Sequence, residues 1–438
     1  MKRTSTALAL ALLTTGVGFL TAACDTQAPQ TPTTSSGNTT PGSSNTTGSG
    51  SGLKIGSLLP ATGDLSSIGQ QMIPAVPFLV ETVNACGGVN GQPVTLIQVD
   101  DQTDPKAGAI GMTKLATVDK VAGVVGSFAS SVSTAAVSIA TQNKVMLISP
   151  GSTSPVFTEQ AKKGEFKGFW ARTVPPDSYQ GPALATLANK RGYKRVSTLV
   201  INNDYGVGFE QAFVRAFEKL GGTVVNKNNP VRYDPKSTTF ESEAAAAFGG
   251  KPDAVLGVFY VETGSLLLKS AYQQGLLQGV QVMLTDGMKS DEFPQQVGKT
   301  NDGKYIVTGV IGTVPGSNGK ALDALTKLWQ SKKGGSPGEF APQSWDATAL
   351  LVLAAQAAKE NTGKGIANKI REVSNAPGVE VTDVCEGLKL LKEGKDINYQ
   401  GASGNVDVDA NGDVIGIYNV WSVEADGKLK TIDKVSPQ

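Results

Sequence analysis

Serine hydroxyls at the ends of predicted strands are the first groups in this chain that could do chemistry. The stretch Gly126–Ser131 (GSFASS) follows an apolar run and precedes a helical one. Hydroxyl groups and free backbone N–H groups at the positive end of a helix can bind a carboxylate. A serine at such a junction can also cap the helix, and we expect one of these serines to do so. The stretch is therefore a candidate carboxylate receptor.

A second polar loop and a carboxylate occupy the same kind of position. Ser149–Ser154 (SPGSTS) leaves another apolar run, and Asp286 ends a run in the second half of the chain. Loops at the carboxyl ends of strands are where open α/β sheets bind ligands. Asp286 could pair with a ligand ammonium group or could be a solvated turn aspartate, and spacing alone does not decide between the two.

Aromatic side chains accompany these loops and could line a pocket. Those near predicted strand or loop ends are Phe128, Tyr205, Phe259, Tyr260 and Trp345. Each such residue is more often part of a core than part of a ligand wall. Charged residues make up only 18% of the chain, so a pocket built from these groups would suit an apolar or neutral side chain.

The composition disfavours most familiar enzyme chemistry. The chain of 438 residues contains no histidine, so it has no Ser-His or Cys-His nucleophile pair and no histidine metal ligand. Cys24, Cys86 and Cys385 are too widely spaced for a four-cysteine zinc site or a CxxC redox pair. Lys and Arg (39) balance Asp and Glu (38), which leaves no electrostatic footprint for nucleic acid. We predict no metal, no cofactor, no nucleic-acid partner and no enzymatic activity.

Three motif matches lack the context that their chemistry requires. Gly334–Gly338 spells GxSxG but follows no predicted strand. Gly298–Lys304 lacks the Ser or Thr with which a P-loop holds Mg²⁺. Asp407–Gly412 matches the first half of an EF-hand loop, but Tyr418 stands where the bidentate Glu is needed. We interpret Asn411 and the following glycine as a hairpin turn.

The N-terminus is typical of an export signal. Lys2 and Arg3 precede an apolar run from Ala7 to Leu20, which is short and interrupted by Thr and Gly. A basic start, a short apolar run and small residues before a cut site indicate a secretory signal rather than a membrane span. Residues 20–24 (LTAAC) resemble a bacterial lipobox. This resemblance implies that residues 1–23 are removed and that Cys24 becomes the first residue and carries lipid.

Residues 24–52 are predicted to be a flexible tether. After the cysteine they contain mainly Ser, Thr, Gly, Pro and Asn, and none could enter a core. As a flexible coil, the segment would span on the order of 30 Å and would hold a folded part clear of the lipid headgroups. We therefore expect an exported protein, anchored by its N-terminal lipid to the outer face of the cytoplasmic membrane. In a Gram-negative cell this is the periplasmic side.

The elements that must position these groups alternate between strands and helices. Alternation of this kind favours parallel sheets with helices on both faces, and so many strands fit two α/β lobes better than one sheet. The clearest helix is Trp345–Lys359, and Pro74 and Pro77 predict a late start or a kink within Gln70–Val83. The predicted strands are Leu53–Leu59, Pro93–Val99, Val121–Val125, Val145–Ser149, Val196–Ile201, Gly222–Asn226, Asp253–Phe259, Val280–Leu284 and Tyr305–Val310.

From about Leu53 to the C-terminus, the chain resembles type I periplasmic binding proteins of the branched-chain amino acid ABC transporter family, the Leu/Ile/Val-binding proteins. The matching stretches run in order: IGSLLPATGDLSSIGQQM, NACGGVNGQPVTL, DDQTDPKAG, GVVGSFASSVSTAAV, VMLISPGSTSP, RTVPPDSYQGPALA, NNDYGVGF and KPDAVLGVFYVETG. The resemblance implies two Rossmann-like α/β lobes, each a mainly parallel sheet flanked by helices, joined by a three-stranded hinge. Lobe 1 would comprise residues 53–173 and 312–407, and lobe 2 residues 174–311 and 408–438.

The resemblance also implies a set of ligand contacts. The hydroxyl that binds the ligand carboxylate falls on Ser130, and further backbone and hydroxyl contacts fall on Gly151 and Thr153. The carboxylate that binds the ligand ammonium group falls on Asp286, and the cleft aromatic of lobe 2 falls on Tyr205. The other members of the predicted ligand-binding set are Ile68, which stands where the family usually has Tyr, together with Phe128, Ser152 and Phe259.

The function implied by the resemblance is capture of an amino acid, neutral or branched-chain, between two closing lobes. The protein would act as a monomer and deliver its ligand to an ABC permease and its ATPase subunits. The alternatives are a ligand-sensing subunit for a signalling receptor, and a ligand that is an amide or a short carboxylate. An enzyme that uses carboxylate or lysine chemistry is a further alternative without a positive sequence feature.

The crossover pattern of the family places Cys86 and Cys385 together in lobe 1. An exported protein can keep disulfides. We therefore predict a bridge between these two cysteines, in preference to two buried free thiols.

Overall fold

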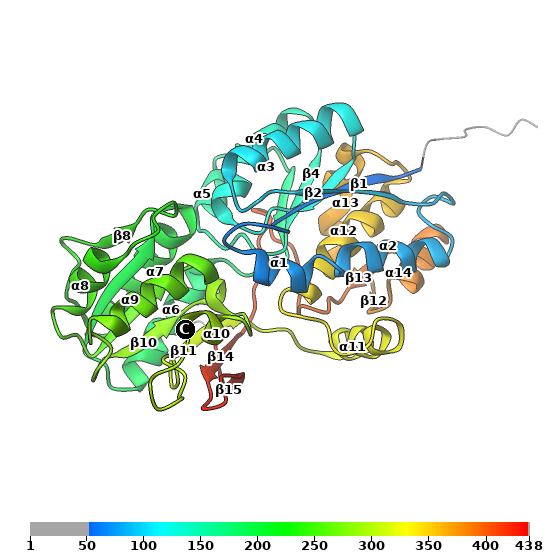
Figure 1. Cartoon of the computed structure of the whole chain (residues 1–438). Helices are drawn as coiled ribbons and strands as arrows, with labels where there is room; N and C mark the ends of the chain where they lie inside the picture. The colour runs from blue at the N-terminus through cyan, green and yellow to red at the C-terminus, as the bar shows by residue number, and fades with distance from the viewer. Residues whose placement is uncertain (1–51, 437–438) are drawn as a thin grey trace, which may run out of the picture. The chain divides into compact units, whose positions relative to one another are not determined.

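The computed structural model describes residues 52–436, so Cys24 and the predicted signal peptide lie outside the described residues. Within that range, none of the helices combines the length and apolar composition that a bilayer crossing requires. The described residues form two α/β lobes, each built on its own main sheet. Figure 1 shows helices α3 and α4 on one side of the first sheet and helices α12 and α13 on the other.

Lobe 1 contains a five-stranded sheet in which every pair of neighbours is parallel. In spatial order its strands are β2 (Thr95–Asp100), β1 (Lys54–Leu59), β3 (Gly123–Gly126), β4 (Met146–Ser149) and β5 (Trp170–Arg172). Its helices are α1 (Ser66–Met72), α2 (Ala75–Ala85), α3 (Pro105–Thr113), the π-helical turn η1 (Lys114–Asp119), α4 (Ser130–Gln142), α5 (Val156–Lys162), α11 (Lys320–Lys332), α12 (Ala341–Ala358), α13 (Gly363–Ser374) and α14 (Val384–Lys392). A small parallel pair, β12 (Val379–Val381) and β13 (Ile397–Tyr399), completes the lobe.

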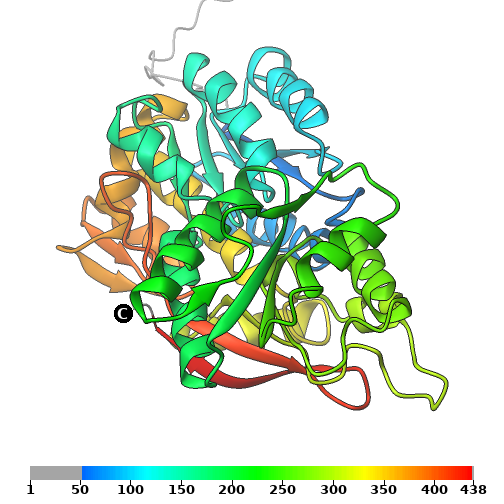
Figure 2. The same cartoon turned by 90° about the vertical axis from the view of Figure 1, so that its left-hand side faces the viewer.

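Lobe 2 contains an eight-stranded mixed sheet. Its spatial order is β15 (Leu429–Val435), β14 (Tyr418–Val423), β11 (Ile311–Pro315), β10 (Gln281–Leu284), β9 (Ala254–Val258), β6 (Arg195–Ile201) and β7 (Thr223–Val224), with β8 (Val231–Tyr233) also paired to β6. Its helices are α6 (Asp177–Lys190), α7 (Asp204–Lys219), α8 (Glu241–Phe248), α9 (Val261–Gln273), the 3-10 turn η2 (Asp286–Met288) and α10 (Phe293–Val297). The antiparallel strands β14 and β15, red in Figure 2, form one edge of this sheet.

The predicted strands are confirmed except for the last one, with ends that shift by a few residues. Residues 305–310 are mostly turn, and the strand there is β11, which begins at Ile311. A hydrogen bond from Thr308 to the Tyr305 carbonyl group and a positive φ of 84° at Gly309 close this turn. An apolar run that contains such a turn cannot stay extended, so the pairing starts after it.

Pro74 divides the first helix where a kink or a late start was predicted, whereas Pro77 lies within the first turn of α2 and does not break it. Helix α1 ends at Met72, and α2 restarts at Ala75, directly after Pro74. Proline has no backbone N–H group and its ring clashes with the preceding turn, so a continuous helix cannot form through Pro74.

The predicted helix Trp345–Lys359 is confirmed as α12, which begins four residues earlier and has Pro342 in its first turn.

The segments that cross between the lobes are tied together by a buried arginine. Arg172, at the end of β5, is fully buried, and its guanidinium group lies 2.7 Å from a carboxylate oxygen of Asp413, in the segment that leads to β14.

The hairpin predicted at Asn411 is absent from this part of the described chain. Asn411 lies in a turn that is closed by backbone hydrogen bonds from Asp409 to Asp413 and from Gly412 to Asp409, but the segments on either side are not strands.

The boundary between the lobes in the third quarter of the chain differs from the expected one. Strand β11 pairs with β10 and β14, so residues 312–315 belong to the sheet of lobe 2 and not to lobe 1. The chain therefore crosses to lobe 1 after Pro315. The family resemblance indicated that the chain crosses between the lobes near residue 312, but it did not show that β11 ends only at Pro315.

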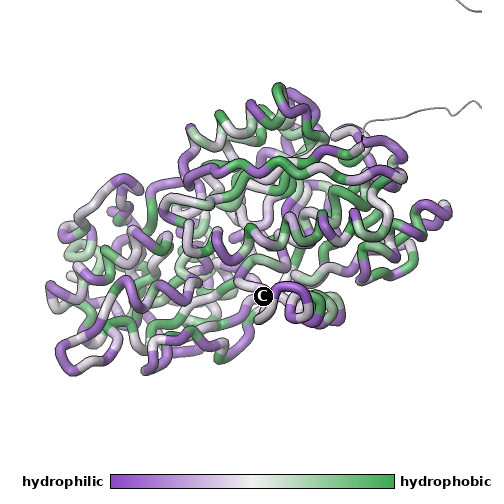
Figure 3. The backbone as a smooth tube through the Cα atoms, turned by 45° about the vertical axis from the view of Figure 1, so that its right-hand side comes forward, coloured by the Kyte–Doolittle hydropathy of each residue, from purple (hydrophilic) through white to green (hydrophobic). Residues whose placement is uncertain are grey.

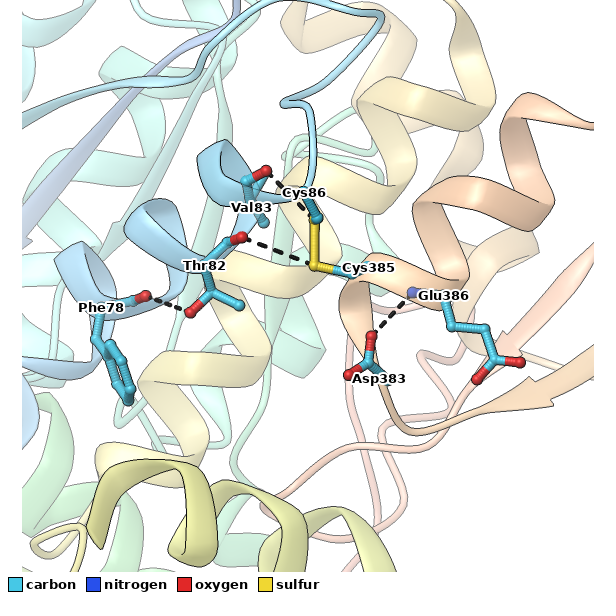
Figure 4. Close-up of a disulfide and its surroundings, with 7 residues drawn as sticks. All are labelled: Phe78, Thr82, Val83, Cys86, Asp383, Cys385 and Glu386. Carbon is cyan, nitrogen blue, oxygen red and sulfur yellow. Dashed lines mark hydrogen bonds between the residues drawn. A yellow bond between two sulfur atoms is a disulfide. The ribbon is translucent and has the colours of Figure 1, made fainter. Parts of the chain in front are cut away.

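The core of both lobes is made of the strands and the helix faces that cover them. In Figure 3 the hydrophobic stretches lie mainly inside, and hydrophilic turns lie mainly at the periphery. The predicted disulfide is confirmed: Cys86, which ends α2, is bonded to Cys385 in α14, 299 residues away (Figure 4). The sulfur of Cys385 lies 3.7 Å from the Thr82 carbonyl oxygen. The bridge is internal to lobe 1.

Candidate functional site

One small pocket collects residues from both lobes. Lobe 1 contributes Leu65, Phe128, Ala129, Ser130 and Gly151, and lobe 2 contributes Tyr205, Tyr260, Asp286 and Gly287. The structure therefore brings five of the predicted site residues together: Phe128, Ser130, Gly151, Tyr205 and Asp286. The cavity that remains between them has a volume of about 10 Å³, which is about the space of one water molecule.

The pocket lies where the sheets of the two lobes present their strand ends. Strand β3 leads into residues 127–129 and helix α4, β4 leads into residues 150–153, and β10 leads into Asp286. Tyr205 stands in the first turn of α7, and Tyr260 is the N-cap of α9. The carboxyl ends of parallel strands and the amino ends of the following helices meet at the same edge of a sheet. This geometry explains why loops far apart in sequence face one cleft.

The lobe 1 side of the pocket can bind an anion. Helix α4 begins at Ser130, and no side chain caps its first turn, so the predicted serine cap is wrong. The Ser130 hydroxyl oxygen accepts a hydrogen bond from the Ser154 backbone N–H group at 3.2 Å, which leaves its own proton for another acceptor. The uncapped first turn and this hydroxyl together place hydrogen-bond donors at the positive end of a helix, an arrangement that suits a carboxylate.

The lobe 2 side of the pocket carries a buried carboxylate. Asp286 is 2% exposed, accepts a hydrogen bond from Gln180 Nε2 at 2.9 Å, and lies 3.0 Å from the Tyr205 hydroxyl group. Burial raises the pKa of Asp286 to about 6, the hydrogen bonds from Tyr205 and Gln180 oppose that rise, and the charge of Glu339 adds to it. A carboxylate in such a position is poised to ionise when a cation approaches.

A second buried carboxylate, Asp177, was missed by the sequence reasoning. It starts helix α6, is fully buried, and neither of its carboxylate oxygens has a hydrogen-bond partner of normal distance and angle among the described residues. Burial, followed by the charge of Asp286, raises its pKa well above the usual value, and the Thr153 hydroxyl and the Arg172 charge oppose that rise. The two aspartates therefore compete for ionisation, and Asp177 is the harder of the two to ionise.

Gly151 is required by close packing against Phe128. A β-carbon at this position would lie 2.1 Å from the Phe128 ring. The same ring packs edge-on against Phe340, with the ring centroids 4.7 Å apart. Phe128 is thereby held against the loop that follows β4, and Gly151 lets the backbone reach the pocket. Both residues were predicted for the site, and both line it.

Four residues of the predicted ligand-binding set do not line the pocket. Ile68 lies on the core side of α1, because the helix begins at Ser66 and the N-cap Leu65 faces the cleft instead. Phe259 packs edge-on against Tyr233, and the next residue, Tyr260, points into the pocket, since successive side chains at a strand end alternate in direction.

The other two are Ser152 and Thr153. The Ser152 hydroxyl group makes buried bonds to Ser127 and Phe128 carbonyl oxygens, each at 3.1 Å, so it supports the loop. Thr153 is buried, and its hydroxyl group lies beside Asp177. Both residues therefore stand behind the pocket wall. Four residues that line the pocket were not assigned to the ligand-binding set: Leu65, Ala129, Tyr260 and Gly287. Ala129 lies in the candidate loop after β3, Gly287 follows Asp286, and Tyr260 had a signal as an aromatic at a strand end, whereas Leu65 and the nearby Asp177 had none.

Direct contacts between the lobes surround the pocket. The Asp64 carboxylate accepts hydrogen bonds from the Thr263 N–H group at 2.9 Å and the Thr263 hydroxyl group at 2.7 Å. The Ser154 hydroxyl group donates to the Asp204 carbonyl oxygen at 2.8 Å. The lobes therefore touch each other beside the pocket, and Asp286 is almost fully enclosed in this arrangement.

Comparison with known proteins gives a consistent family. Residues 71–426 match the protein family described as "Receptor family ligand binding region". The chain is 27% identical over 370 residues to the chemotactic signal transduction system substrate-binding protein BasB of Halobacterium salinarum, covering 82% of this chain and 84% of that protein. It is 28% identical over 327 residues to Leu/Ile/Val-binding protein homolog 2 of Brucella abortus, covering 73% and 82%.

Solved structures show the same fold. The leucine binding protein LivK of Thermotoga maritima matches with a TM-score of 0.73 and 26% identity, covering 88% of this chain and 99% of that one. The branched-chain amino acid transporter substrate binding protein LivJ of Streptococcus pneumoniae, solved in complex with isoleucine, matches with a TM-score of 0.71 and 22% identity, covering 88% and 100%.

Proposed function

Because the chain belongs to the receptor ligand-binding-region family, within its Leu/Ile/Val-binding protein-like branch, we propose that it captures an amino acid between its two lobes. The chain is a binding protein and not an enzyme. One observation carries the proposal: Asp286 of lobe 2 and the Ser130 helix end of lobe 1 line a single pocket. An amino acid zwitterion carries an ammonium group that could pair with Asp286 and a carboxylate that could bind at the Ser130 helix end.

The proposed binding mode assigns each ligand charge to a different lobe. The ligand carboxylate is bound by the Ser130 hydroxyl group and the first turn of α4, with the Gly151 backbone nearby. The ammonium group is bound by Asp286, which the Tyr205 hydroxyl group orients, while burial favours the protonated form of the nearby Asp177. Only the closed arrangement satisfies both charges, so the ligand stabilises closure through its higher affinity for the closed lobes.

The proposed ligand side chain is neutral, in keeping with the branched-chain amino acids. The pocket wall around the charged groups is formed by Leu65, Phe128, Tyr205 and Tyr260, and the two tyrosine rings stack with centroids 5.7 Å apart. Apolar and aromatic walls with a few oriented polar groups are typical of small-molecule sites. The names of the relatives, a leucine binding protein and Leu/Ile/Val-binding homologues, support the same ligand class.

The proposed partner is an ABC permease with its ATPase subunits, which would recognise the closed protein as a monomer. The exported, lipid-anchored location is proposed from the sequence of residues 1–52 alone. Cys24 would carry the lipid, and the tether would hold the two lobes above the outer face of the cytoplasmic membrane, on the periplasmic side of a Gram-negative cell. Retention of the full chain in membranes, and its release by Cys24→Ser, would test the anchor.

A sensing role is the second candidate, because BasB, a relative over 82% of this chain, is named as part of a chemotactic signal transduction system. Both roles use the same capture step and differ in the partner. Cross-linking of the ligand-loaded protein in its own membrane, followed by identification of the partner as a permease or as a signalling receptor, distinguishes them.

Calorimetry with Asp286→Asn tests the proposed function. We first identify the molecule that co-purifies with the protein by mass spectrometry, and then titrate neutral, branched-chain and aromatic amino acids. Asp286→Asn keeps the size of the side chain but removes its charge, and we expect it to weaken amino acid binding by about 2–5 kcal/mol, since the ligand ammonium group would be buried unpaired. Asp302→Asn, which changes an exposed turn aspartate of the same lobe, is the matched control.

Unchanged affinity in the Asp286 variant would contradict the assignment. Binding of only amides or short carboxylates by the unmodified protein would replace the amino acid with that ligand class.

A further inference from the structure

The strongest unexplained contact between the lobes is the pair formed by Asp64 and Thr263. Asp64 lies in the loop before α1 of lobe 1, and Thr263 lies in the first turn of α9 of lobe 2, 199 residues away. The carboxylate receives two hydrogen bonds, at 2.9 Å from the backbone N–H group and at 2.7 Å from the hydroxyl group. The Tyr233 hydroxyl group lies 3.0 Å from the same Thr263 oxygen, so it can donate to Thr263 while Thr263 donates to Asp64.

The geometry of this pair is that of a helix cap supplied from the other lobe. An N-cap side chain accepts a bond from the second or third N–H group of its helix, and Thr263 is the third residue of α9. The residue in the N-cap position of α9, Tyr260, makes no such bond. By contrast, α3 is capped by its own Asp104, and α7 is capped by its own Asn203.

The pair is also directly connected to the proposed ligand pocket. Leu65, which follows Asp64, lines the pocket from lobe 1, and Tyr260, just before α9, lines it from lobe 2. Placing Asp64 on the first turn of α9 therefore brings these two pocket walls together. A change at this cap would alter the pocket only through the closure of the lobes, because Asp64 and Thr263 do not themselves line it.

The Asp64 pair is better suited to hold the lobes together than the other contacts between them. The ion pair between Lys289 and Glu339 is 3.4 Å long, and both side chains keep some exposure, so it is expected to contribute little. The Ser154 contact is a single bond between neutral groups. A carboxylate that accepts two bonds gains more, because charge-assisted hydrogen bonds are about twice as strong as neutral ones. Burial raises the pKa of Asp64, the charge of Glu262 adds to that rise, and the bonds from Thr263 oppose it. These bonds therefore offset part of the cost of enclosing the charge.

We propose that Asp64 is a positioning residue for ligand capture: it caps helix α9 across the cleft and holds the two lobes closed without touching the ligand. The proposal rests on the proposed function for its link to capture. Because the cap can form only when the lobes are closed, losing it should destabilise the closed state and leave the open state unchanged. Contacts made only after association change the dissociation rate more than the association rate.

Hydrogen exchange of the full chain, measured without ligand, tests the cap itself. In Asp64→Ala the peptide that contains Tyr260–Leu266 should exchange faster by about tenfold, because the Thr263 N–H group loses its acceptor. Asp64→Asn should restore most of the protection, since its amide group can accept from the N–H group and donate to the hydroxyl group. Unchanged protection of this peptide in Asp64→Ala would overturn the proposal, whether or not the protein binds amino acids.

Stopped-flow dissociation of the amino acid that the unmodified protein binds best tests the link to capture. We expect Asp64→Ala to dissociate about tenfold faster with little change in association rate, and Asp64→Asn to fall near the unmodified protein. Asp104→Ala is the matched control. Asp104 caps its own helix α3 within lobe 1, and together with Asp64 it lines a second pocket between the lobes. This variant should lower the melting temperature and leave dissociation unchanged. Equal dissociation rates in Asp64→Ala and Asp104→Ala would overturn the positioning role.

If Asp64→Ala does not fold, as judged by circular dichroism, Thr263→Ala replaces it in both measurements. This variant removes the hydroxyl bond to Asp64 and keeps the backbone one, so we expect a smaller change in the same direction. Faster exchange and faster dissociation in Thr263→Ala would support the cap, and no change in either would overturn it.

Discussion

Asp286 combines two properties that a ligand-binding carboxylate needs: it is enclosed, and it is held in place. The hydrogen bonds from Gln180 and Tyr205 fix its orientation, while burial and the nearby Glu339 charge keep its pKa near 6. Below a pH of about 6, an ammonium group that enters the pocket replaces a proton on this carboxyl group. Asp177, whose pKa is raised further, keeps its proton while Asp286 ionises. At the residue scale, the site is therefore built for one positive charge.

The pH dependence of binding follows from this arrangement. Below a pH of about 6, Asp286 holds a proton that must leave before the ammonium group can bind, so affinity should fall by about tenfold for each pH unit below that value. Above it the carboxylate is already ionised, and affinity should be constant until the ligand amine loses its proton. Calorimetry between about pH 4.5 and pH 8, in buffers of different ionisation enthalpy, measures both the affinity and the released proton.

Asp286→Asn serves as the control for this titration, because it removes the ionisation and should flatten the profile. The same affinity at pH 5 and pH 7 in the unmodified protein would show that Asp286 does not meet the ligand ammonium group.

The residues of the site differ in how far they could be predicted. Ser130, Gly151 and Asp286 follow apolar strands in the sequence, so a strand-end rule finds them. Asp177 follows two prolines and no recognisable strand end, and it becomes important only because the fold buries it beside Asp286. Ile68 was predicted to face the cleft, but Leu65 does so. The residue that faces the cleft depends on where the short helix α1 starts, and no cap side chain marks that start in the sequence.

At the scale of elements, the alternation of strands and helices was readable because each buried strand is an apolar run. The exception, residues 305–310, is apolar but turns at Gly309. The cap of α9 by Asp64 could not be predicted, since the two partners are 199 residues apart and belong to different lobes. Local sequence patterns determine where helices and strands form, whereas a contact between two elements depends on the tertiary fold that brings distant segments together.

The disulfide joins α2 and α14 within lobe 1 and lies outside the pocket. Because it closes a loop of 299 residues, replacing both cysteines should lower the free energy of unfolding by about 3–5 kcal/mol. Affinity should be unchanged, because neither lobe closure nor the pocket uses these side chains. We would compare denaturant unfolding of the unmodified protein with that of Cys86→Ser/Cys385→Ser, and titrate both with the same amino acid.

Reduction of the unmodified protein is the control for this comparison and should reproduce the loss of stability. Two free thiols in the unreduced, denatured protein, in addition to any at Cys24, would contradict the bridge.

At the scale of the whole molecule, the proposed binding mode uses a different lobe for each end of one ligand. Lobe 1 offers a helix end and a hydroxyl group, lobe 2 offers a carboxylate, and the segments between the lobes are held by the buried Arg172–Asp413 pair. The cavity of about 10 Å³ means that an amino acid must enter an open form and that the pocket must widen around it. A two-state hinge biased by the ligand describes this behaviour.

The central claim is that both charges of one small ligand are matched by groups on opposite lobes. The most direct test titrates the unmodified protein with its best amino acid, with the amide of that amino acid, and with the acid that lacks the amino group. We predict that each derivative binds at least about 30-fold more weakly than the parent, at a cost of about 2 kcal/mol or more. The acid leaves the buried Asp286 carboxylate unpaired, and the amide has lost the negative charge and places an NH₂ donor where it can face the donors of lobe 1. Equal affinity for the parent and for either derivative would contradict the claim.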